Sequence, residues 1–457
     1  NVRYDLGYLN AALERSGRPR LANRSVDTLS LARRLVRDEV PNCRLGTLAQ
    51  RFRLPNQPCH RALDDALATG DLLHLLLERA GRLGVCGLDD LLSLPTMGGH
   101  PQAGKLRLTD KLPRTPGVYL FRDRGGRTLY VGKASNLRSR VRSYFSGDDR
   151  RKVGQLLRET ERIDHVVCPS ALEAAVLEVR LIHRLEPRFN RQLTTWRRYV
   201  YLKLTDERFP RLSVVKAIRD DAALYLGPLP SHQAAKRVAE AIETAVPLRR
   251  CTATPGRQLR AGACAAAQLG VATCPCAGQT SEDAYAAIVA TVRRGLLHEP
   301  AVLLGPLEQK MHALAAAERF EEAAEMRDRA AALTAAIRRQ RRFDALRRAG
   351  RLVVEFGERS GAELDHGRLV RAWSIGSAGV APVPLPLDLD PAAPDALVSP
   401  LDGDPSLPGR PVPKAVADEL ACVAAWLEKE AARIRVVHAD RGLASAYPAL
   451  PSYQPVR

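Results

Sequence analysis

The spacing of apolar positions changes along the chain, and each change marks a different kind of element. Residues 1–84 carry apolar side chains at helical spacing, which predicts a helix-rich segment. Pro and Gly are frequent in residues 85–112, which predicts a linker. From Pro113 onwards short apolar runs at 118–121 and 128–131 flank a Gly-containing turn. These two runs predict paired strands.

Helical spacing returns after these strands. A basic helix is predicted at 136–145, and a second helix begins at Ser170, an N-cap with Glu173 as its capping-box partner. Residues 301–345 predict two helices that form a hairpin. Residues 346–457 mix strand-like and helical runs, which predicts an α+β C-terminal segment of unknown role.

Length and charge narrow the class of protein. The 457 residues are enough for two to four domains, and 45% of them are hydrophobic, so separate cores are expected. The net charge of +19 suits a polyanion such as DNA, although a basic proteome explains it equally well. No apolar run approaches the roughly 18 residues that span a bilayer. The nine unevenly spread cysteines and the lack of a leader predict a cytoplasmic protein, and the missing initial Met predicts a fragment.

Two Gly- and Tyr-containing runs precede a basic helix, and a lone Glu follows in an apolar helix. The residues are Gly117, Val118 and Tyr119, then, after ten others, Tyr130, Val131 and Gly132, followed by Lys133, Arg140, Tyr144 and Glu178. The two runs alone would predict only a hairpin. Arg140 and Tyr144 lie one turn apart, so both side chains project from one helical face. Glu178 is either a solvated carboxylate or a metal ligand.

This ordered set, from Pro113 to Asn190, resembles the GIY-YIG nucleases of the UvrC and Cho type. The resemblance implies a small α/β domain at 113–200, with a three-stranded antiparallel sheet and flanking helices. It also implies a UvrC-like extension at 201–300. The expected chemistry is metal-assisted hydrolysis of a phosphodiester.

The same resemblance implies a role for each site residue. Glu178 would hold Mg²⁺ or Mn²⁺, and Arg140 would stabilise the transition-state charge. Tyr119 and Tyr130 would flank the attacking water, one of them as general base, and Tyr144 would position the phosphate or the water. Catalytic roles are thus expected for Tyr119, Tyr130, Lys133, Arg140 and Tyr144, with Lys133 lowering the pKa of Tyr130. Nucleic-acid contacts are expected at Lys133, Asn136, Arg138, Arg140, Arg142 and Asn190.

The first 84 residues carry a second resemblance. Asp5, His60 and Asp65 resemble the second and third motifs of DnaQ-like 3′–5′ exonucleases. That family implies a partial RNase H-like fold, with Asp5 and Asp65 as metal ligands and His60 as general base. The family's first motif, Asp-x-Glu, would precede Asn1. The module is therefore expected to be truncated and inactive as an exonuclease.

Four cysteines follow the nuclease-like segment, at Cys251, Cys264, Cys274 and Cys276. In UvrC a comparable region carries four cysteines, which hold an iron–sulfur cluster in some members. Here Ala272 stands where a third cysteine is usual, and only one residue separates Cys274 from Cys276. A [4Fe-4S] cluster, a zinc site and unliganded thiols remain alternatives.

The hairpin at 301–345 resembles the UVR motif, through which UvrC contacts UvrB. The resemblance implies a UvrB-like helicase as partner, although a hairpin packed on its own chain is the alternative. The residues expected to contact the partner are Phe320, Glu321, Ala323, Ala324 and Arg327.

These expectations combine into a multi-domain α/β DNA repair nuclease that acts on damaged duplex DNA. Past residue 346 the chain departs from UvrC and lacks the acidic pattern of its second nuclease domain, which favours a single, Cho-like incision. The alternatives are a non-catalytic DNA-binding adaptor and a proofreading-like exonuclease within a longer parent. The sequence does not indicate the oligomeric state.

Overall fold

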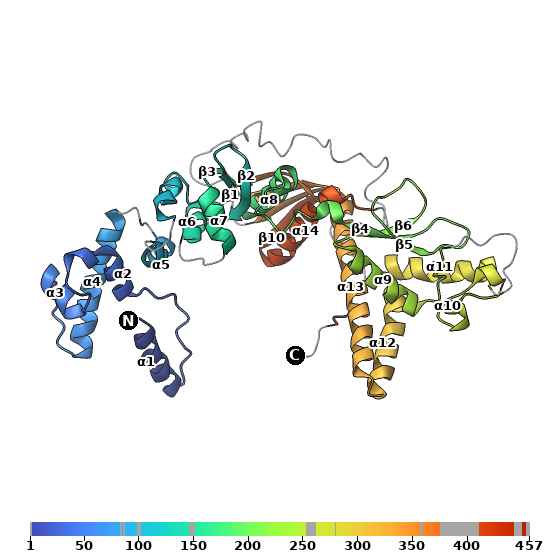
Figure 1. Ribbon diagram of the computed structural model, residues 1–457, viewed down its shortest axis with the longest axis horizontal. Coiled ribbons are helices and arrows are strands. Elements are labelled where there is room, and N and C mark those ends of the chain that lie inside the picture. The colour runs from blue at the N-terminus through green and yellow to red at the C-terminus, as the bar shows by residue number, and fades with distance from the viewer. Residues whose placement is uncertain are drawn as a thin grey trace. The chain divides into compact units, whose positions relative to one another are not determined.

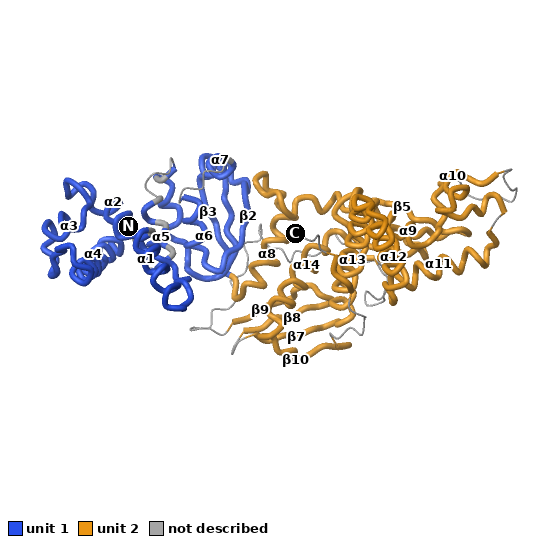
Figure 2. Tube along the Cα trace, turned by 90° about the horizontal axis from the view of Figure 1, so that it is seen from below, with its two compact units in different colours: residues 1–167 blue, residues 168–457 orange. Residues whose placement is uncertain are grey.

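The computed structural model describes residues 2–82, 85, 87–97, 102–145, 151–252, 262–278, 280–356, 360–374, 411–442 and 450–453. The chain divides into two compact units, residues 1–167 and 168–457 (Figure 2). Within the described ranges, no helix is both long and apolar enough to cross a membrane. The predicted region 346–457 is described only in part.

The N-terminal part of the first unit is helical. Its elements are α1 (Val2–Arg15), α2 (Thr28–Leu35), η1 (Arg37–Glu39), α3 (Leu45–Phe52), α4 (Ala62–Arg82), α5 (Leu88–Met97) and η2 (Ala103–Thr109). Helices α2, α3, α4 and α5 share a core that includes Leu31, Leu48, Leu76 and Leu91. The helix-rich prediction is confirmed, but the described part of residues 2–97 contains no strand. The RNase H-like fold is therefore not seen there.

The predicted linker is more ordered than its Pro and Gly content suggested. Helix α5 packs into the core of the N-terminal helices through Leu91 and Leu94. The buried Asp90 on the same helix also forms an ion pair of 2.7 Å with Arg114, which lies just before the first strand. Residues 87–97 thus belong to the packed structure of the first unit.

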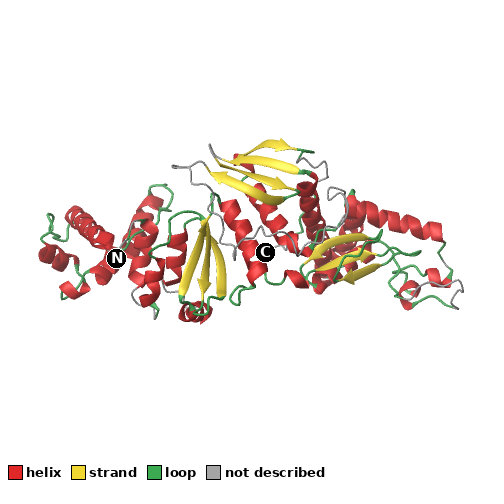
Figure 3. Ribbon diagram, turned by 90° about the horizontal axis from the view of Figure 1, so that it is seen from above, coloured by secondary structure: helices red, strands yellow, loops and turns green. Residues whose placement is uncertain are grey.

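The rest of the first unit contains a three-stranded antiparallel sheet in the order β2-β1-β3. Its strands are among the yellow arrows of Figure 3. Its elements are β1 (Gly117–Arg122), β2 (Thr128–Ala134), α6 (Leu137–Arg142), η3 (Ser143–Phe145), α7 (Arg151–Glu159) and β3 (Arg162–Val167). The predicted strands, basic helix and antiparallel sheet are confirmed.

The second unit begins with α8 (Ala171–Leu185) and η4 (Trp196–Arg198). Ser170 caps α8, because its hydroxyl accepts a hydrogen bond of 3.1 Å from the backbone N–H of Glu173. The predicted N-cap is confirmed. The capping box is not completed, because Glu173 Oε2 is buried without a hydrogen-bond partner among the described residues.

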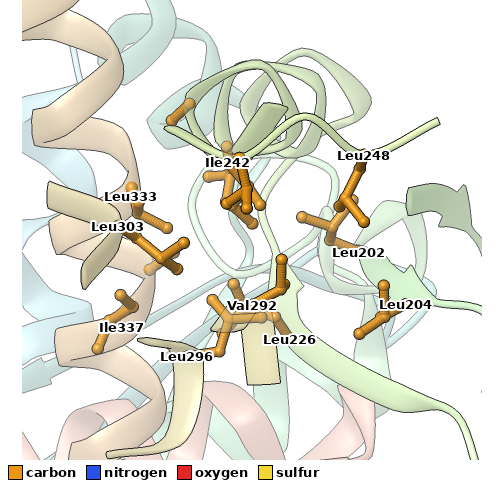
Figure 4. Packing of buried hydrophobic residues seen from close by; sticks show 14 of the residues in the cluster. Leu202, Leu204, Leu226, Ile242, Leu248, Val292, Leu296, Leu303, Leu333 and Ile337 are labelled. Atoms are coloured by element: carbon orange, nitrogen blue, oxygen red, sulfur yellow. The ribbon is translucent and has the colours of Figure 1, made fainter. Parts of the chain in front are cut away.

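A second antiparallel sheet, in the order β5-β4-β6, follows α8. Its strands and the elements that follow are β4 (Val200–Leu204), β5 (Leu212–Val215), β6 (Leu224–Leu229), α9 (His232–Ala245), α10 (Ala265–Gln268), η5 (Pro275–Ala277) and α11 (Glu282–Leu297). Side chains from this sheet, α9 and α11 form one core with the helices that come next (Figure 4).

The predicted hairpin is present as α12 (Ala301–Ala316) and α13 (Phe320–Arg348), which lie side by side (Figure 1). The C-terminal elements are β7 (Arg351–Phe356), β8 (Ser360–Asp365), β9 (Arg368–Ser374), α14 (Lys414–Lys429), η6 (Ala431–Arg433) and β10 (Ile434–Ala439). They form a four-stranded antiparallel sheet, β10-β7-β8-β9, whose apolar side chains pack with α14. The α+β prediction is confirmed.

Candidate active site

The strand pair β1–β2 places the two motif tyrosines on one face of the sheet. Tyr119 pairs with Gly132, and Phe121 pairs with Tyr130. Residues directly opposite on antiparallel strands share a face, so the rings approach each other. The ring centroids of Tyr119 and Tyr130 are 6.2 Å apart, and those of Phe121 and Tyr130 are 6.1 Å apart.

Both motif glycines are required by space. A Cβ atom on Gly132 would lie 2.4 Å from the hydroxyl oxygen of Tyr119. A Cβ atom on Gly117 would lie 2.2 Å from the carbonyl oxygen of Val166 on β3 and 2.8 Å from Cδ1 of Leu137. Gly132 therefore makes room for the phenol of Tyr119, and Gly117 allows β3 and α6 to approach β1 closely.

The segment that follows α6 completes the cluster. The hydroxyl of Tyr144 is 2.8 Å from that of Tyr119. Its ring centroid is 6.1 Å from that of Tyr130. Arg140, one turn earlier, has its guanidinium carbon 5.3 Å from the Tyr144 ring centroid and also hydrogen-bonds Tyr119. The predicted cluster of Tyr119, Tyr130, Arg140 and Tyr144 is therefore assembled.

Burial sets the protonation of this cluster. Burial raises the pKa of Tyr119, and Tyr130 raises it further, although Tyr144 and Arg140 oppose the shift. Burial likewise raises the pKa of Tyr144. Both phenols are therefore protonated at neutral pH. Burial lowers the pKa of Arg140, but the surrounding tyrosines outweigh it and raise the pKa above its usual value, so the guanidinium stays charged.

Arg142 does not serve the predicted nucleic-acid contact, because it is only 5% exposed. Its Nε donates to the hydroxyl of Thr109 at 3.0 Å, and its Nη2 donates to Asp110 at 3.3 Å. Its Nη1 lies 3.8 Å from the carboxylate of Asp90. Arg142 therefore joins α6 to α5 and to the end of η2 inside the first unit.

Asn136 and Lys133, also predicted to contact nucleic acid, have other positions in the structure than that prediction suggested. Asn136 caps α6, because its side-chain oxygen accepts the N–H of Ser139 at 3.0 Å. Lys133 is exposed and pairs with Val118, so it leaves β2 on the face opposite Tyr130. The strand register does not direct Lys133 towards Tyr130, and the effect of Lys133 on that tyrosine stays a prediction. Arg138 and Asn190 are half-buried.

His165 on β3 was not predicted as a site residue, but it pairs with Tyr119 and therefore lies on the same face of the sheet. It is half-buried, and burial lowers its pKa, so the imidazole is neutral at neutral pH. The alternation of residues 162–167 could have placed it opposite the first motif strand. Phe121 was not predicted as a site residue either, although its spacing of two from Tyr119 predicts the shared face.

Glu178 lies in the second unit, halfway along α8, and is half-buried. Most of its neighbours in the helix are buried apolar residues. Nearer the start of α8, burial raises the pKa of Glu173 to about 7, although Arg180 opposes the shift. Glu178 is the residue whose carboxylate was predicted to bind a metal ion, and that role stays a prediction.

The other predicted metal sites are not assembled. Among the described residues, no three His, Cys, Asp or Glu side chains are arranged to hold a metal ion. Cys264 and Cys274 are hydrogen-bonded to each other, but the four-cysteine set does not form the ligand shell that a [4Fe-4S] cluster needs. Asp5, His60 and Asp65 do not form a metal site either, although the backbone N–H of His60 donates to Asp65 at 3.2 Å.

The hairpin leaves part of its predicted contact set accessible. Phe320 is 67% exposed at the start of α13, and Glu321 beside it is exposed. Ala324 and Arg327 are half-buried, and Arg327 pairs with Asp328 at 2.8 Å. Ala323 is 8% exposed, so the predicted direct contact of Ala323 with a partner is wrong for this structure.

Three family models match successive parts of the chain. Residues 115–191 match the UvrC-like GIY-YIG domain, residues 199–295 the UvrC/Cho excinuclease middle domain, and residues 302–335 the UvrB/uvrC motif. The first match contains the tyrosine cluster, Arg140 and Glu178. The third falls on the hairpin of α12 and α13. Residues 1–114 lie outside these three matches.

Relatives extend the similarity over the whole chain. A bifunctional exonuclease/endonuclease protein of Mycobacterium tuberculosis (strain CDC 1551 / Oshkosh) is 37% identical over an alignment of 456 residues, which covers 97% of this chain and 68% of that protein. The UvrABC system protein C of Desulforudis audaxviator (strain MP104C) is 40% identical over 229 residues, 50% of this chain and 37% of that protein. The chain thus spans little more than a third of that UvrC protein.

A solved structure is similar to part of the chain. It is the GIY-YIG N-terminal endonuclease domain of UvrC from Thermotoga maritima, bound to magnesium, with 34% identity over 19% of this chain and 97% of that chain. The TM-score is 0.18. The UvrC-like GIY-YIG domain makes this chain a nuclease. Because it covers more than two thirds of the mycobacterial relative, the chain belongs to the family of that bifunctional exonuclease/endonuclease protein, with an endonuclease domain of the UvrC type.

Proposed function

We propose that the chain nicks damaged duplex DNA in nucleotide excision repair, by metal-assisted hydrolysis at Tyr119, Tyr130, Arg140 and Tyr144, with Glu178 as the metal ligand. The observation that carries the proposal is the cluster of three phenols around one guanidinium, with the Tyr119 and Tyr144 hydroxyls 2.8 Å apart. A guanidinium beside oriented hydroxyls suits a phosphate whose charge rises during the reaction.

The donor chemistry fits Mg²⁺ or Mn²⁺. Glu178 is a half-buried carboxylate, and the described residues contain no preformed shell of three or more ligands. Mg²⁺ suits such a site, because it keeps several waters and is commonly held by one or two carboxylates together with phosphate oxygens. When bound, the cation would neutralise charge on the scissile phosphate.

The chain's own residues would orient the substrate and handle the proton. Arg140 would bind the phosphate, since its charge is permanent. Tyr130 is the better candidate for the general base, because it is half-buried whereas Tyr119 is fully buried with a raised pKa. A water oxygen would bond to phosphorus as the bond to one bridging oxygen breaks. The hydroxyls of Tyr119 and Tyr144 would fix the phosphate.

The hairpin supports delivery by a UvrB-like helicase. Its match to the UvrB/uvrC motif covers residues 302–335, and Phe320 and Glu321 are exposed within it. An exposed phenylalanine at a helix start offers an anchor that a partner could bury. We propose that this end of α13 contacts the partner.

A second activity is proposed for the N-terminal helices, in a longer parent chain. The mycobacterial relative is named as an exonuclease as well as an endonuclease. Leu63 and Leu67 on α4 are exposed beside Asp65 and His60, as expected if a further layer of a DnaQ-like domain covers them. Digestion of 3′-labelled DNA by the full-length parent and its Asp65→Ala variant tests this activity. Equal digestion by both proteins would contradict it.

The endonuclease is tested by nicking of a duplex that carries one bulky adduct, with Mg²⁺ or Mn²⁺. Wild type, Glu178→Ala and the control Glu282→Ala, an exposed carboxylate on α11, are compared with and without UvrA and UvrB. Cation-dependent nicks lost only in Glu178→Ala support the proposal. If nicking depends on UvrB, the result supports the role of the hairpin as the contact with that partner. DNA binding without any nicking by wild type would leave the non-catalytic adaptor instead.

A further inference from the structure

One face of α8 is buried in the C-terminal domain, here residues 346–374 and 411–440. Leu172 and Val176 on α8 belong to the same core as Leu352, Val354 and Leu420 of that domain. The helix that carries Glu178 therefore completes the core of the C-terminal domain.

An ion pair fastens the same face. Both nitrogens Nε and Nη2 of Arg180 donate to the carboxylate of Glu419 on α14, at 3.0 Å and 2.5 Å. The side chain of Glu419 is 4% exposed and that of Arg180 is 20% exposed. Glu419 also accepts the backbone N–H of Leu369 at 3.0 Å, and Arg180 donates to the Leu369 carbonyl at 2.7 Å. This bidentate pair thus joins α8, β9 and α14.

The neighbouring residue of α14 makes a second connection. Asp418 Oδ2 is 2.9 Å from His183 Nε2, and Asp418 Oδ1 accepts the hydroxyl of Tyr199 at 2.8 Å. All three side chains are buried at these contacts. The imidazole of His183 stacks on Trp196, with centroids 5.0 Å apart and an interplanar angle of 20°. Two successive acidic residues of α14 therefore hold the second half of α8.

Glu178 leaves α8 from the other side. At about 100° per residue, Leu172, Val176, Arg180 and His183 fall within an arc of about 80°. Glu178 lies about 160° from the centre of that arc. The contacts with the C-terminal domain consequently fix the rotation and height of α8 from the face opposite Glu178.

We infer that the C-terminal domain positions the metal-ligand helix of the nuclease, with Asp418 and Glu419 as positioning residues. The inference rests on the proposed role of Glu178. A ligand on a helix is placed only as well as the helix itself, and a displacement of about 1 Å can cost about 100-fold in rate. The C-terminal domain thus acts on hydrolysis through α8.

The experiment compares Asp418→Asn, Glu419→Gln and the milder Tyr199→Phe with Glu355→Gln, which removes an exposed ion pair with Arg435 in the same domain. Full chains are assayed for nicking, for the half-saturating Mn²⁺ concentration, for the KM of DNA and for hydrogen exchange of residues 171–185. We expect the first three variants to lose about tenfold or more in kcat, to need more Mn²⁺ and to exchange faster in α8, at unchanged KM. Glu355→Gln should match wild type.

A double variant separates positioning from loss of the fold. Removing both charges in Arg180→Leu with Glu419→Leu should recover part of the activity lost in Glu419→Leu alone, because no uncompensated buried charge remains. The inference would be overturned if Glu178→Ala is inactive while Asp418→Asn and Glu419→Gln keep the wild-type kcat, the wild-type Mn²⁺ requirement and the wild-type hydrogen exchange of α8. Nicking by Glu178→Ala would instead overturn the proposed function, and α8 exchange would still report whether α14 holds the helix.

Discussion

The hydroxyl of Tyr119 lies 2.8 Å from the hydroxyl of Tyr144, inside a site where burial raises the pKa of both phenols. One residue comes from the central strand β1 and the other from the turn after α6. Because one hydroxyl donates to the other, and Arg140 and Tyr130 supply further hydrogen bonds, the pair keeps two polar groups buried in a fixed orientation. The two tyrosines are therefore expected to act as a unit.

Removing either hydroxyl should impair nicking by about 10- to 100-fold, because the remaining hydroxyl loses its orientation. Tyr119→Phe, Tyr144→Phe and the double variant are compared in single-turnover nicking. The double variant should be little worse than either single one, since groups that act together are not additive. Tyr201→Phe, a buried tyrosine that donates to the Val412 carbonyl, is the control. Multiplicative losses in the double variant would contradict the coupling.

Gly132→Ala should displace Tyr119, because the new Cβ would lie 2.4 Å from its hydroxyl oxygen. A destabilisation of about 1–3 kcal/mol and a strong loss of nicking are expected. Gly154→Ala, on α7, meets nothing within 4 Å and should be neutral or slightly stabilising. Thermal unfolding and nicking of both variants measure the difference. A Gly132→Ala protein that nicks like wild type would contradict the packing argument.

Arg142→Ala should act on stability and leave the electrostatics of DNA binding unchanged. Its guanidinium is buried with Asp90, Asp110 and Thr109, so its loss should cost about 3 kcal/mol. The slope of log K against log salt for DNA should stay at the wild-type value. Lys133→Ala, an exposed cation, should instead reduce that slope by about one unit without loss of stability. A reduced slope for Arg142→Ala would contradict this internal role and would support the predicted contact of Arg142 with DNA.

Glu173 should make the stability of α8 depend on pH. Its pKa is raised to about 7 in the folded chain, chiefly by burial, so folding favours the protonated form. This stabilisation is complete below the ordinary carboxyl range and is lost as pH rises through about 7. From pH 5 to pH 8 the opening free energy of residues 171–185 should fall by about 1–2 kcal/mol, allowing for solvent screening.

Hydrogen exchange at both pH values measures the effect of Glu173. Glu173→Gln should remove the pH dependence, and Glu428→Gln, an exposed carboxylate paired with Arg342, should retain it. A wild-type chain with equal protection of α8 at pH 5 and pH 8 would contradict the assignment.

Local patterns were sufficient for the elements and for most of the tyrosine cluster. The strands around Tyr119 and Tyr130, the cap at Ser170 and the turn that separates Arg140 from Tyr144 each depend on a few neighbouring residues. These features follow from period, capping and helical geometry. For the same reason the three-stranded sheet and the hairpin of α12 and α13 were predictable.

The failures involve partners that are distant in the chain. Arg138, Arg140 and Arg142 look alike in sequence, but Arg142 is buried because Asp90 and Thr109, more than thirty residues earlier, receive it. Asp418 lies 235 positions after its partner His183, and Glu419 lies 239 positions after its partner Arg180. No local signal in the sequence therefore marks Asp418 or Glu419. The RNase H-like expectation depended on motif residues alone, and the described N-terminal segment shows only helices.

The shared helix α8 has a practical consequence for anyone who isolates the endonuclease. A fragment that ends near residue 200 would expose the apolar side chains of Leu172 and Val176 to water. It would also strip Arg180 and His183 of their acidic counterparts. Such a fragment would be poorly soluble for reasons unrelated to its chemistry, and its low activity would be mistaken for a weak enzyme.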